Sequence, residues 1–291
     1  MIGRIALAAL ALALAAHAAA DERFAKGMLW RVTRVDAAPS YVFGTIHLAD
    51  PRVLEIPEPV LRALHASRRF AMEAPQWSGH DQRLLEAAQF EDGRDLASVV
   101  GADTFQKVRA ALGARSLPEP VIARIKPWAA LANIAVVPED YASTTLDQKL
   151  LALARGRRME IRALEGTEEH ISVFEGIPLE TQVAMLRHTL DERDYLASMI
   201  EPTLQAWLRR DLAGIHAVNE RIIARFPGVA AHYRLLARHL VDNRSVVMAH
   251  RLFVPLRGGR MFVAVGAAHL YGNAGLLGMI ERQGYRVARV Y

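Results

Sequence analysis

The segment YVFGTIHLAD, residues 41–50, places a titratable side chain directly after an apolar run. The run 41–43 ends at Gly44, and His47 follows three residues later. A second segment near the other end of the chain, VAVGAAH at 263–269, has the same order of strand, glycine, two small or apolar residues and histidine. We therefore expect one site to form where strands from the two ends of the chain meet.

The two histidines occupy equivalent positions in these segments. His47 and His269 each follow the carboxyl end of a predicted strand, the edge at which open α/β sheets collect ligands. Gly44 and Gly266 would let the chain turn sharply or adopt a positive φ, bringing each imidazole back over the sheet edge. Either histidine alone is better explained by a structural role. The pair points to a shared site.

Two glutamates have a similar placement. Glu73 ends the short strand RFAME, and Glu165 ends MEIRALE at 159–165. A lone glutamate at a strand end is usually a solvated rim residue or a helix-cap acceptor. However, two His nitrogens and one carboxylate oxygen form a common ligand set for a catalytic divalent metal. Such an ion turns water into a nucleophile at neutral pH, and the second carboxylate would serve as general base or orient a histidine.

The first twenty residues have the layout of a secretory signal peptide. Arg4 precedes an apolar stretch at 5–16, and small residues at 18–20 precede Asp21. The apolar stretch is shorter than the roughly 20 residues that a spanning helix needs, although a short N-terminal anchor is the alternative. We expect cleavage near Ala20 and a periplasmic or secreted protein without a stable membrane span. The chain has no cysteine, so no disulfide stabilises it.

The chain carries a formal net charge of +5. Its arginines are scattered in four short groups, at 68–69, 155–158, 209–210 and 257–260, without an aromatic-interleaved basic stripe. We interpret them as solvated surface and expect no nucleic-acid partner.

The predicted fold is α/β (α+β), with a central mixed sheet whose strands come from both ends of the mature chain. After the signal peptide, 21–291 is expected to form a single domain with a helical insert at about 81–256. The strand–helix–strand order at the C-terminus indicates some parallel pairing. Strands are predicted at 29–35, 41–43, 69–73, 159–165, 261–270 and 285–291. Helices are predicted from 57, over 81–89, 101–112, 120–125, 127–137, 144–155, 167–174, 179–200, 203–209, 213–226 and 230–256, and after 272.

These segments resemble the TraB/PrgY/GumN family over nearly all of the mature chain. YVFGTIHLAD is similar to the family's first motif, and RFAME to the strand that supplies its glutamate. LEGTEEHISVFEGIPLETQVAMLRHTLDE resembles the central segment, and FVAVGAAHLYGNAGLL the second histidine motif. Animal relatives include the Tiki proteins, proposed to be metal-dependent peptidases that clip Wnt ligands. The resemblance implies a peptidase-like hydrolase of peptides or proteins that uses Mn, Co or Zn.

By this resemblance, His47, Glu73 and His269 are the candidate metal or active-site residues. Glu73, Glu165 and Arg244 are the candidate catalytic residues. Arg244 would bind a carboxylate or oxyanion through its fixed donor fork, and a surface helix position is the alternative.

The sequence departs from the family pattern at two positions near the candidate residues. Gly166 separates Glu165 from Thr167, where the family usually has threonine directly after the glutamate. The order Asn243-Arg244 also replaces the Arg-Asn pair that the family tends to carry.

Other functions and residues are less favoured by the sequence. It contains no HExxH, GxSxG or phosphate-binding GxxxxGK motif, and no nucleotide cofactor is predicted. His170 lies one helical turn past Glu165 and is expected to face solvent, with a position at the site as the alternative. Surface or partly buried positions are expected for His188, His216, His232, His239 and His250. The family's association with pheromone shutdown and the long helical insert leave a non-catalytic protein that sequesters peptides or partners as the alternative. Hydrolysis of non-peptide esters or amides also stays open.

Overall fold

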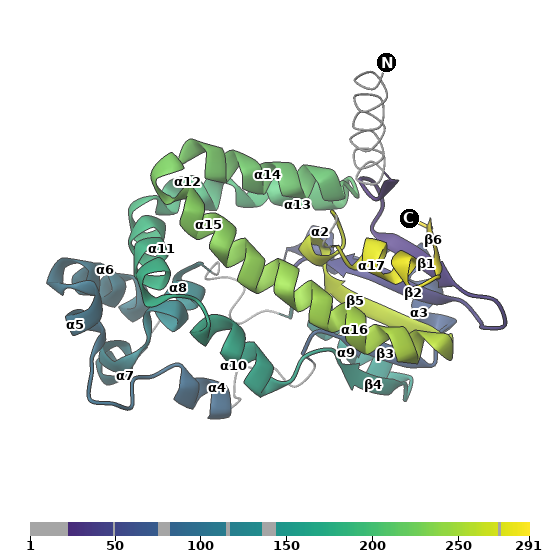
Figure 1. Cartoon of the computed structure of the whole chain (residues 1–291), viewed down its shortest axis with the longest axis horizontal. Coiled ribbons are helices and arrows are strands. Elements are labelled where there is room, and N and C mark those ends of the chain that lie inside the picture. The colour runs from purple at the N-terminus through teal and green to yellow at the C-terminus, as the bar shows by residue number, and fades with distance from the viewer. Residues whose placement is uncertain (1–22, 49, 75–81, 115–116, 136–143, 273–274) are drawn as a thin grey trace, which may run out of the picture.

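A six-stranded mixed sheet brings the two ends of the described chain together (Figure 1). The computed structural model describes residues 23–48, 50–74, 82–114, 117–135, 144–272 and 275–291, so the predicted signal peptide lies outside the described residues. The strands, in the order β4-β3-β5-β2-β1-β6, are β1 Leu29–Thr33, β2 Ser40–Thr45, β3 Arg69–Met72, β4 Glu160–Ala163, β5 Met261–Gly266 and β6 Arg286–Arg289.

Four adjacent strands are parallel. β5 pairs in parallel with β2 on one side and with β3 on the other, and β3 pairs in parallel with β4. β1 and β2 form the predicted antiparallel hairpin, and β6 extends the sheet antiparallel to β1. The predicted mixed sheet is thus confirmed. The parallel pairing predicted near the C-terminus is found between β5 and its neighbours β2 and β3. β6 does not neighbour β5 and pairs with β1 instead.

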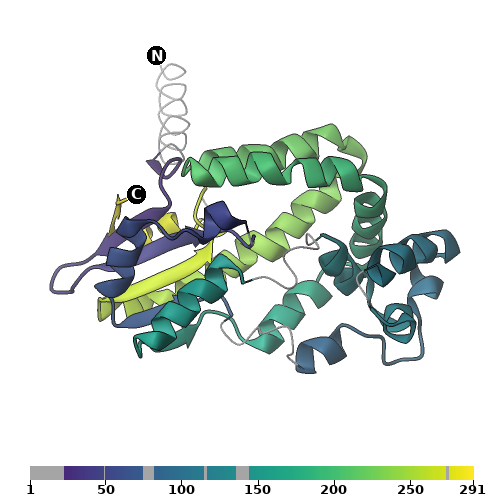
Figure 2. The same ribbon diagram turned by 180° about the vertical axis from the view of Figure 1, so that it is seen from behind.

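Helices cover both faces of the sheet. α16 (Arg244–Arg257) and α17 (Leu276–Arg282) lie on the face towards the viewer in Figure 1. α3 (Glu58–His65) and α9 (Leu146–Gly156) cover the other face, seen in Figure 2. All six residues of β5 are buried, as expected for a central strand with an uninterrupted apolar run.

Most of the remaining chain is helical, as predicted. Besides β4, which joins the sheet, the described residues between 82 and 257 form helices and their connections. Two short helices differ from the prediction. α5 (Leu96–Val100) forms where no element was predicted, and α12 (Arg193–Ser198) is a separate helix within the range 179–200 that was predicted as continuous. None of the described helices is long and apolar enough to cross a lipid bilayer. The further helices are α2 Pro51–Leu54, α4 Gln82–Ala87, α5 Leu96–Val100, α6 Ala102–Gly113, α7 Glu119–Arg124, α8 Pro127–Ala135, α10 Thr167–Glu175, α11 Leu179–Asp191, α12 Arg193–Ser198, α13 Ile200–Leu208, α14 Leu212–Arg225, α15 Ala230–Ala237, and the π-helical segment η3 Arg238–Asn243.

The register of the parallel strands sets the position of the candidate site. Thr45 pairs with Gly266, and Met72 pairs with Ala264 and Ala163. The carboxyl ends of these strands therefore share one edge of the sheet. The residues that follow each strand are delivered to that edge.

Candidate functional site

His269 ends the 3-10 turn η4 (Ala267–His269) that follows β5, and it is buried. Its Nδ1 lies 2.9 Å from Oγ of Ser245, which donates its own proton to the Val241 carbonyl at 2.7 Å. Because the Ser245 hydroxyl donates its only proton to Val241, it acts as the acceptor towards His269, whose Nδ1 carries the proton. Nε2 therefore keeps a free lone pair, 3.8 Å from Oε1 of Glu73. Burial, only partly offset by Glu73, lowers the pKa of His269, which favours the neutral ring.

His47 follows β2 and is held by a carboxylate from α9. Its Nδ1 lies 2.9 Å from Oδ2 of Asp147, whose other oxygen accepts a 2.7 Å hydrogen bond from the Thr45 hydroxyl. The side chain of His47 is 61% exposed, whereas Asp147 is buried. The surrounding protein displaces part of the solvent and so opposes the imidazolium charge, although most of the ring stays exposed; the hydrogen bond to Asp147 and the charges of Asp147 and Glu73 outweigh this effect. Together they raise the pKa of His47 to about 9.

Glu73 follows β3 and lies between the two histidines and an arginine. Its Oε1 accepts a 2.7 Å hydrogen bond from the Gly266 amide, and its Oε2 accepts one of 2.6 Å from Nη2 of Arg244. Burial alone would raise the pKa of this carboxyl. The His269 imidazole, the Arg244 guanidinium, the His47 imidazolium and the Gly266 N–H instead lower the pKa of Glu73 to about 2. Glu73 is therefore an ionised, anchored carboxylate.

Gly266 marks the point on which the three groups converge. A Cβ atom there would lie 3.3 Å from Oε1 of Glu73, 3.4 Å from Nε2 of His47 and 3.5 Å from Cδ2 of His269. The φ of Gly266 is −53°, and neither this glycine nor Gly44 has a positive φ. Of the two predicted roles of these glycines, a sharp turn or a positive φ, the positive φ is therefore wrong. Glycine leaves space here, because any larger side chain at 266 would occupy the centre of the cluster.

Arg244 joins both candidate glutamates at the start of α16. It donates to Glu165 through two parallel hydrogen bonds of 2.7 and 2.6 Å, and to Glu73 through a third of 2.6 Å. Its side chain is only 10% exposed, so it is no surface helix residue. Burial would raise the pKa of Glu165, but the neighbouring His170 imidazole and the hydrogen bonds from Arg244 lower it. Both oxygens of Glu165 hold the guanidinium, which favours a positioning role.

His170 corrects the prediction that it faces solvent. It is 7% exposed, and its Nδ1 lies 3.8 Å from Oε2 of Glu165. Its ring makes an edge contact with Phe174, at 4.9 Å between centroids. Residues four apart share one face of a helix, so the buried side of α10 carries both rings. The other five histidines of the helical range are exposed or partly buried, as predicted.

Asp147 and Ser245 are residues that the sequence did not single out. Asp147 lies in the first turn of α9, where an acidic residue is commonplace. Ser245 directly follows Arg244, so its position offered a weak signal. Each holds Nδ1 of one histidine and leaves Nε2 for the cluster.

The donor set suits a divalent metal in type and orientation. Ligand histidines usually bond a carboxylate or another acceptor through their second nitrogen, as His47 and His269 do. The 3.8 Å between Nε2 of His269 and Oε1 of Glu73 compares with about 3.4 Å between two ligands of a tetrahedral ion at ~2.1 Å. Among the residues that the structure describes, no three His, Asp or Glu side chains lie close enough together to hold a metal ion. The predicted metal roles stay predictions.

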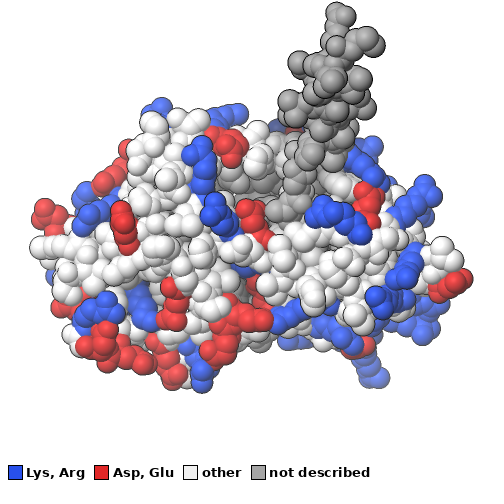
Figure 3. All heavy atoms as spheres, viewed as in Figure 1, with Lys and Arg blue, Asp and Glu red and all other residues white. Residues whose placement is uncertain are grey.

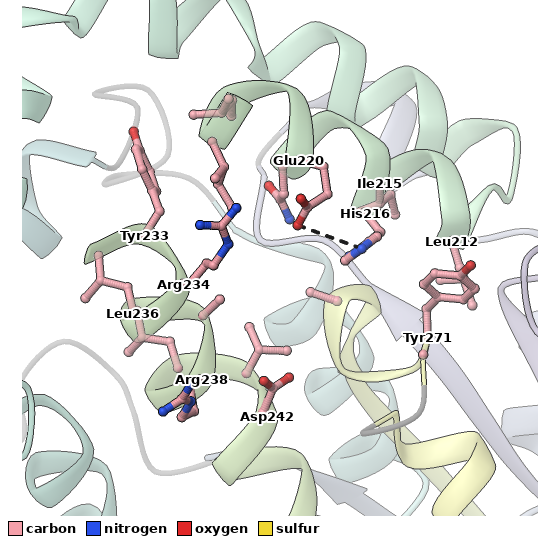
Figure 4. Close-up of a pocket in the computed structure, with 18 residues that line it drawn as sticks. Leu212, Ile215, His216, Glu220, Tyr233, Arg234, Leu236, Arg238, Asp242 and Tyr271 are labelled. Atoms are coloured by element: carbon pink, nitrogen blue, oxygen red, sulfur yellow. Dashed lines mark ion pairs between the residues drawn. The ribbon is translucent and has the colours of Figure 1, made fainter. Parts of the chain in front are cut away.

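A pocket of about 670 Å³ opens beside the His269 turn. It lies between α14 and the α15–η3 segment, and Tyr271 from the turn forms part of its wall (Figure 4). His216 and Glu220 from α14 form an ion pair of 4.0 Å across from Arg234 of α15. The pocket offers both apolar and charged groups to a molecule that reaches the site.

The comparisons with known proteins identify one family. The model of the TraB/PrgY/gumN family matches residues 28–289, which include every candidate site residue. No curated protein and no solved structure matches the chain.

Proposed function

Because this chain belongs to the TraB/PrgY/gumN family, we propose that it is a metal-dependent hydrolase, acting on peptides outside the cytoplasm. His47, Glu73 and His269 would hold the ion through Nε2, a carboxylate oxygen and Nε2. The choice of a peptide bond and of Mn, Co or Zn follows from the family resemblance. Export follows from the predicted signal peptide.

The observation that carries this proposal is the convergence over Gly266. Two imidazoles from opposite ends of the chain meet beside an ionised carboxylate: His47 directs its Nε2 to the point over Gly266, His269 brings its Cδ2 there, and Nε2 of His269 lies 3.8 Å from Oε1 of Glu73. Both rings are fixed by bonds at Nδ1, so their orientation does not depend on a ligand. When bound, a divalent ion polarises a carbonyl oxygen and lowers the pKa of water.

The remaining residues would set the charge and orientation of the site. Glu73, with a pKa of about 2, is a poor proton acceptor at neutral pH and is better suited to bind a cation. Arg244 compensates the charges of Glu73 and Glu165 and fixes both carboxylates. His47 is half open to solvent and would be the ring nearest an incoming substrate.

The second candidate function is capture of a peptide or partner without cleavage. The pocket between α14 and α15 favours it, because a molecule bound there would lie against the His269 turn whether or not chemistry follows. Its walls combine apolar side chains with Arg234, Glu220 and Asn219, which suits a chain with polar backbone groups.

A peptide-digestion assay with and without added Mn²⁺, Co²⁺ or Zn²⁺ separates the two functions. We expect cleavage that needs the ion and is lost in His47→Ala. His250→Ala, which changes an exposed histidine on α16, serves as the matched control and should retain cleavage. Equal cleavage by His47→Ala would contradict the proposal. Tight binding of intact peptide by metal-free protein would instead support capture.

A further inference from the structure

Arginines from four separate segments meet at the edge of the sheet opposite the candidate site. They surround the amino ends of β3, β4 and β5, whereas the site lies at the carboxyl ends. Six of them form a group that we name the basic edge: Arg34, Arg68, Arg157, Arg158, Arg257 and Arg260.

Backbone contacts place these segments side by side. The Arg68 amide donates to the Arg260 carbonyl at 2.8 Å, and the Glu160 amide donates to the Arg68 carbonyl at 3.2 Å. The Arg260 amide donates to the Pro39 carbonyl of the β1–β2 hairpin at 3.1 Å. Nη2 of Arg157 reaches the His65 carbonyl at 3.3 Å. The fold thus gathers charges that are far apart in the sequence.

The basic edge is exposed and little neutralised. All six arginines are exposed, and none forms an ion pair with a carboxylate of the described residues. The acidic residues within these segments are Asp36 at the hairpin turn and Glu160, which pairs with Arg162. Figure 3 shows Lys and Arg gathered over the sheet end of the molecule, with Asp and Glu more frequent at the helical end.

Two exposed apolar side chains accompany these charges. Val35 is 83% exposed and follows Arg34 directly, and Val254 is 67% exposed, one helical turn before Arg257. They are the most exposed large apolar residues of the described chain. Arginines with neighbouring apolar side chains are typical of surfaces that lie on a bilayer, with the charges at the headgroups and the apolar groups below them. A nucleic acid would not require exposed valines.

We propose that the basic edge docks on a bilayer surface containing anionic phospholipid. The guanidinium groups would bind lipid phosphates through paired hydrogen bonds, and Val35 and Val254 would enter the headgroup layer. The site at the other ends of the strands would then face away from the bilayer. The inference does not depend on the proposed hydrolase activity.

Vesicle co-sedimentation of the full chain tests this inference. The probes are vesicles of phosphatidylcholine alone and vesicles in which phosphatidylglycerol replaces part of it. We expect binding to the anionic vesicles only, weakened by salt. The variant Arg68→Glu/Arg260→Glu should bind more than about tenfold more weakly. The control Arg193→Glu/Arg221→Glu makes the same charge change on exposed arginines of α12 and α14 and should bind nearly as wild type.

A second variant separates a bilayer from other polyanions. Val35→Asp should weaken binding to anionic vesicles far more than binding to duplex DNA of equal charge concentration. Circular dichroism and thermal unfolding verify that each variant is folded. Equal losses in the two arginine variants, binding to phosphatidylcholine alone, or tighter binding to DNA than to anionic vesicles would each overturn the inference.

Discussion

Nδ1 of His47 lies 2.9 Å from Oδ2 of Asp147, which is buried at the first turn of α9. The partner of the first motif histidine thus comes from the helix that covers one face of the sheet. The bond orients Nε2 towards Gly266 and raises the pKa of His47 despite the cost of lost solvent.

Asp147→Asn removes the charge that stabilises the His47 imidazolium. We expect the pKa of His47 to fall below about 9, as measured by NMR titration of the imidazole protons. Metal affinity measured above pH 9, where His47 has lost its proton in both proteins, should fall by roughly 10- to 100-fold, because the bond that orients the ligand is weakened. Asp103→Asn, in the first turn of α6, is the matched control and should change neither quantity. An unchanged His47 pKa would contradict the assigned bond.

Metal binding should release protons in the neutral range. With a pKa of about 9, His47 is mostly protonated at neutral pH, and a metal ion must displace that proton to use Nε2. Burial lowers the pKa of His269, so that ring is already neutral. We therefore expect about one proton released per ion, and affinity rising about tenfold per pH unit up to about 9. Calorimetry in buffers of different ionisation enthalpy measures this release, and a value near zero would exclude His47 as a ligand.

Ser245→Ala should free the His269 ring. It leaves a buried Nδ1–H without its acceptor, which we expect to lower the free energy of unfolding by about 1–3 kcal/mol. Ser172→Ala removes an exposed hydroxyl that bonds only a backbone carbonyl and is the control. Urea unfolding measures both. Equal, small effects would show that the Ser245 bond does not fix the ring.

Arg244→Ala should destabilise the protein strongly, because it leaves two buried carboxylates without their cation. We expect a loss of about 3–5 kcal/mol in unfolding free energy. Combining it with Glu165→Gln should recover part of that loss. Arg52→Ala, which removes an exposed arginine that also contacts two carboxylates, should have little effect. Similar losses for Arg244 and Arg52 would contradict the buried network.

Glu73 should make stability depend on pH in the acid range. Its pKa falls from 4.5 to about 2 on folding, so its contribution is present above pH 4.5 and is lost as the pH falls towards 2. The shift corresponds to about 3 kcal/mol. In Glu73→Gln this part of the slope should disappear, and its unfolding free energy should approach that of the wild type at low pH. Parallel curves from urea unfolding across pH 2–5 would contradict the assignment.

The sheet and the edge that holds the candidate site could be predicted because apolar strands and the residues after them are local features. Asp147 and Ser245 could not, because helical periodicity does not tell which polar residue faces the sheet edge. His170 was placed in solvent because nothing in its sequence context reveals the aromatic face that it shares with Phe174. The clustering of Arg68 with Arg260 depends on strand order, which the sequence leaves open.

The proposed function requires that His47, Glu73 and His269 form one cation site. Calorimetric titration of the purified protein with Mn²⁺, Co²⁺ and Zn²⁺ tests it most directly, beside His269→Ala and the control His250→Ala. We expect one ion per chain for the wild type and the control, and none at comparable affinity for His269→Ala. Absence of binding by the wild type, or undiminished binding by His269→Ala, would contradict the claim.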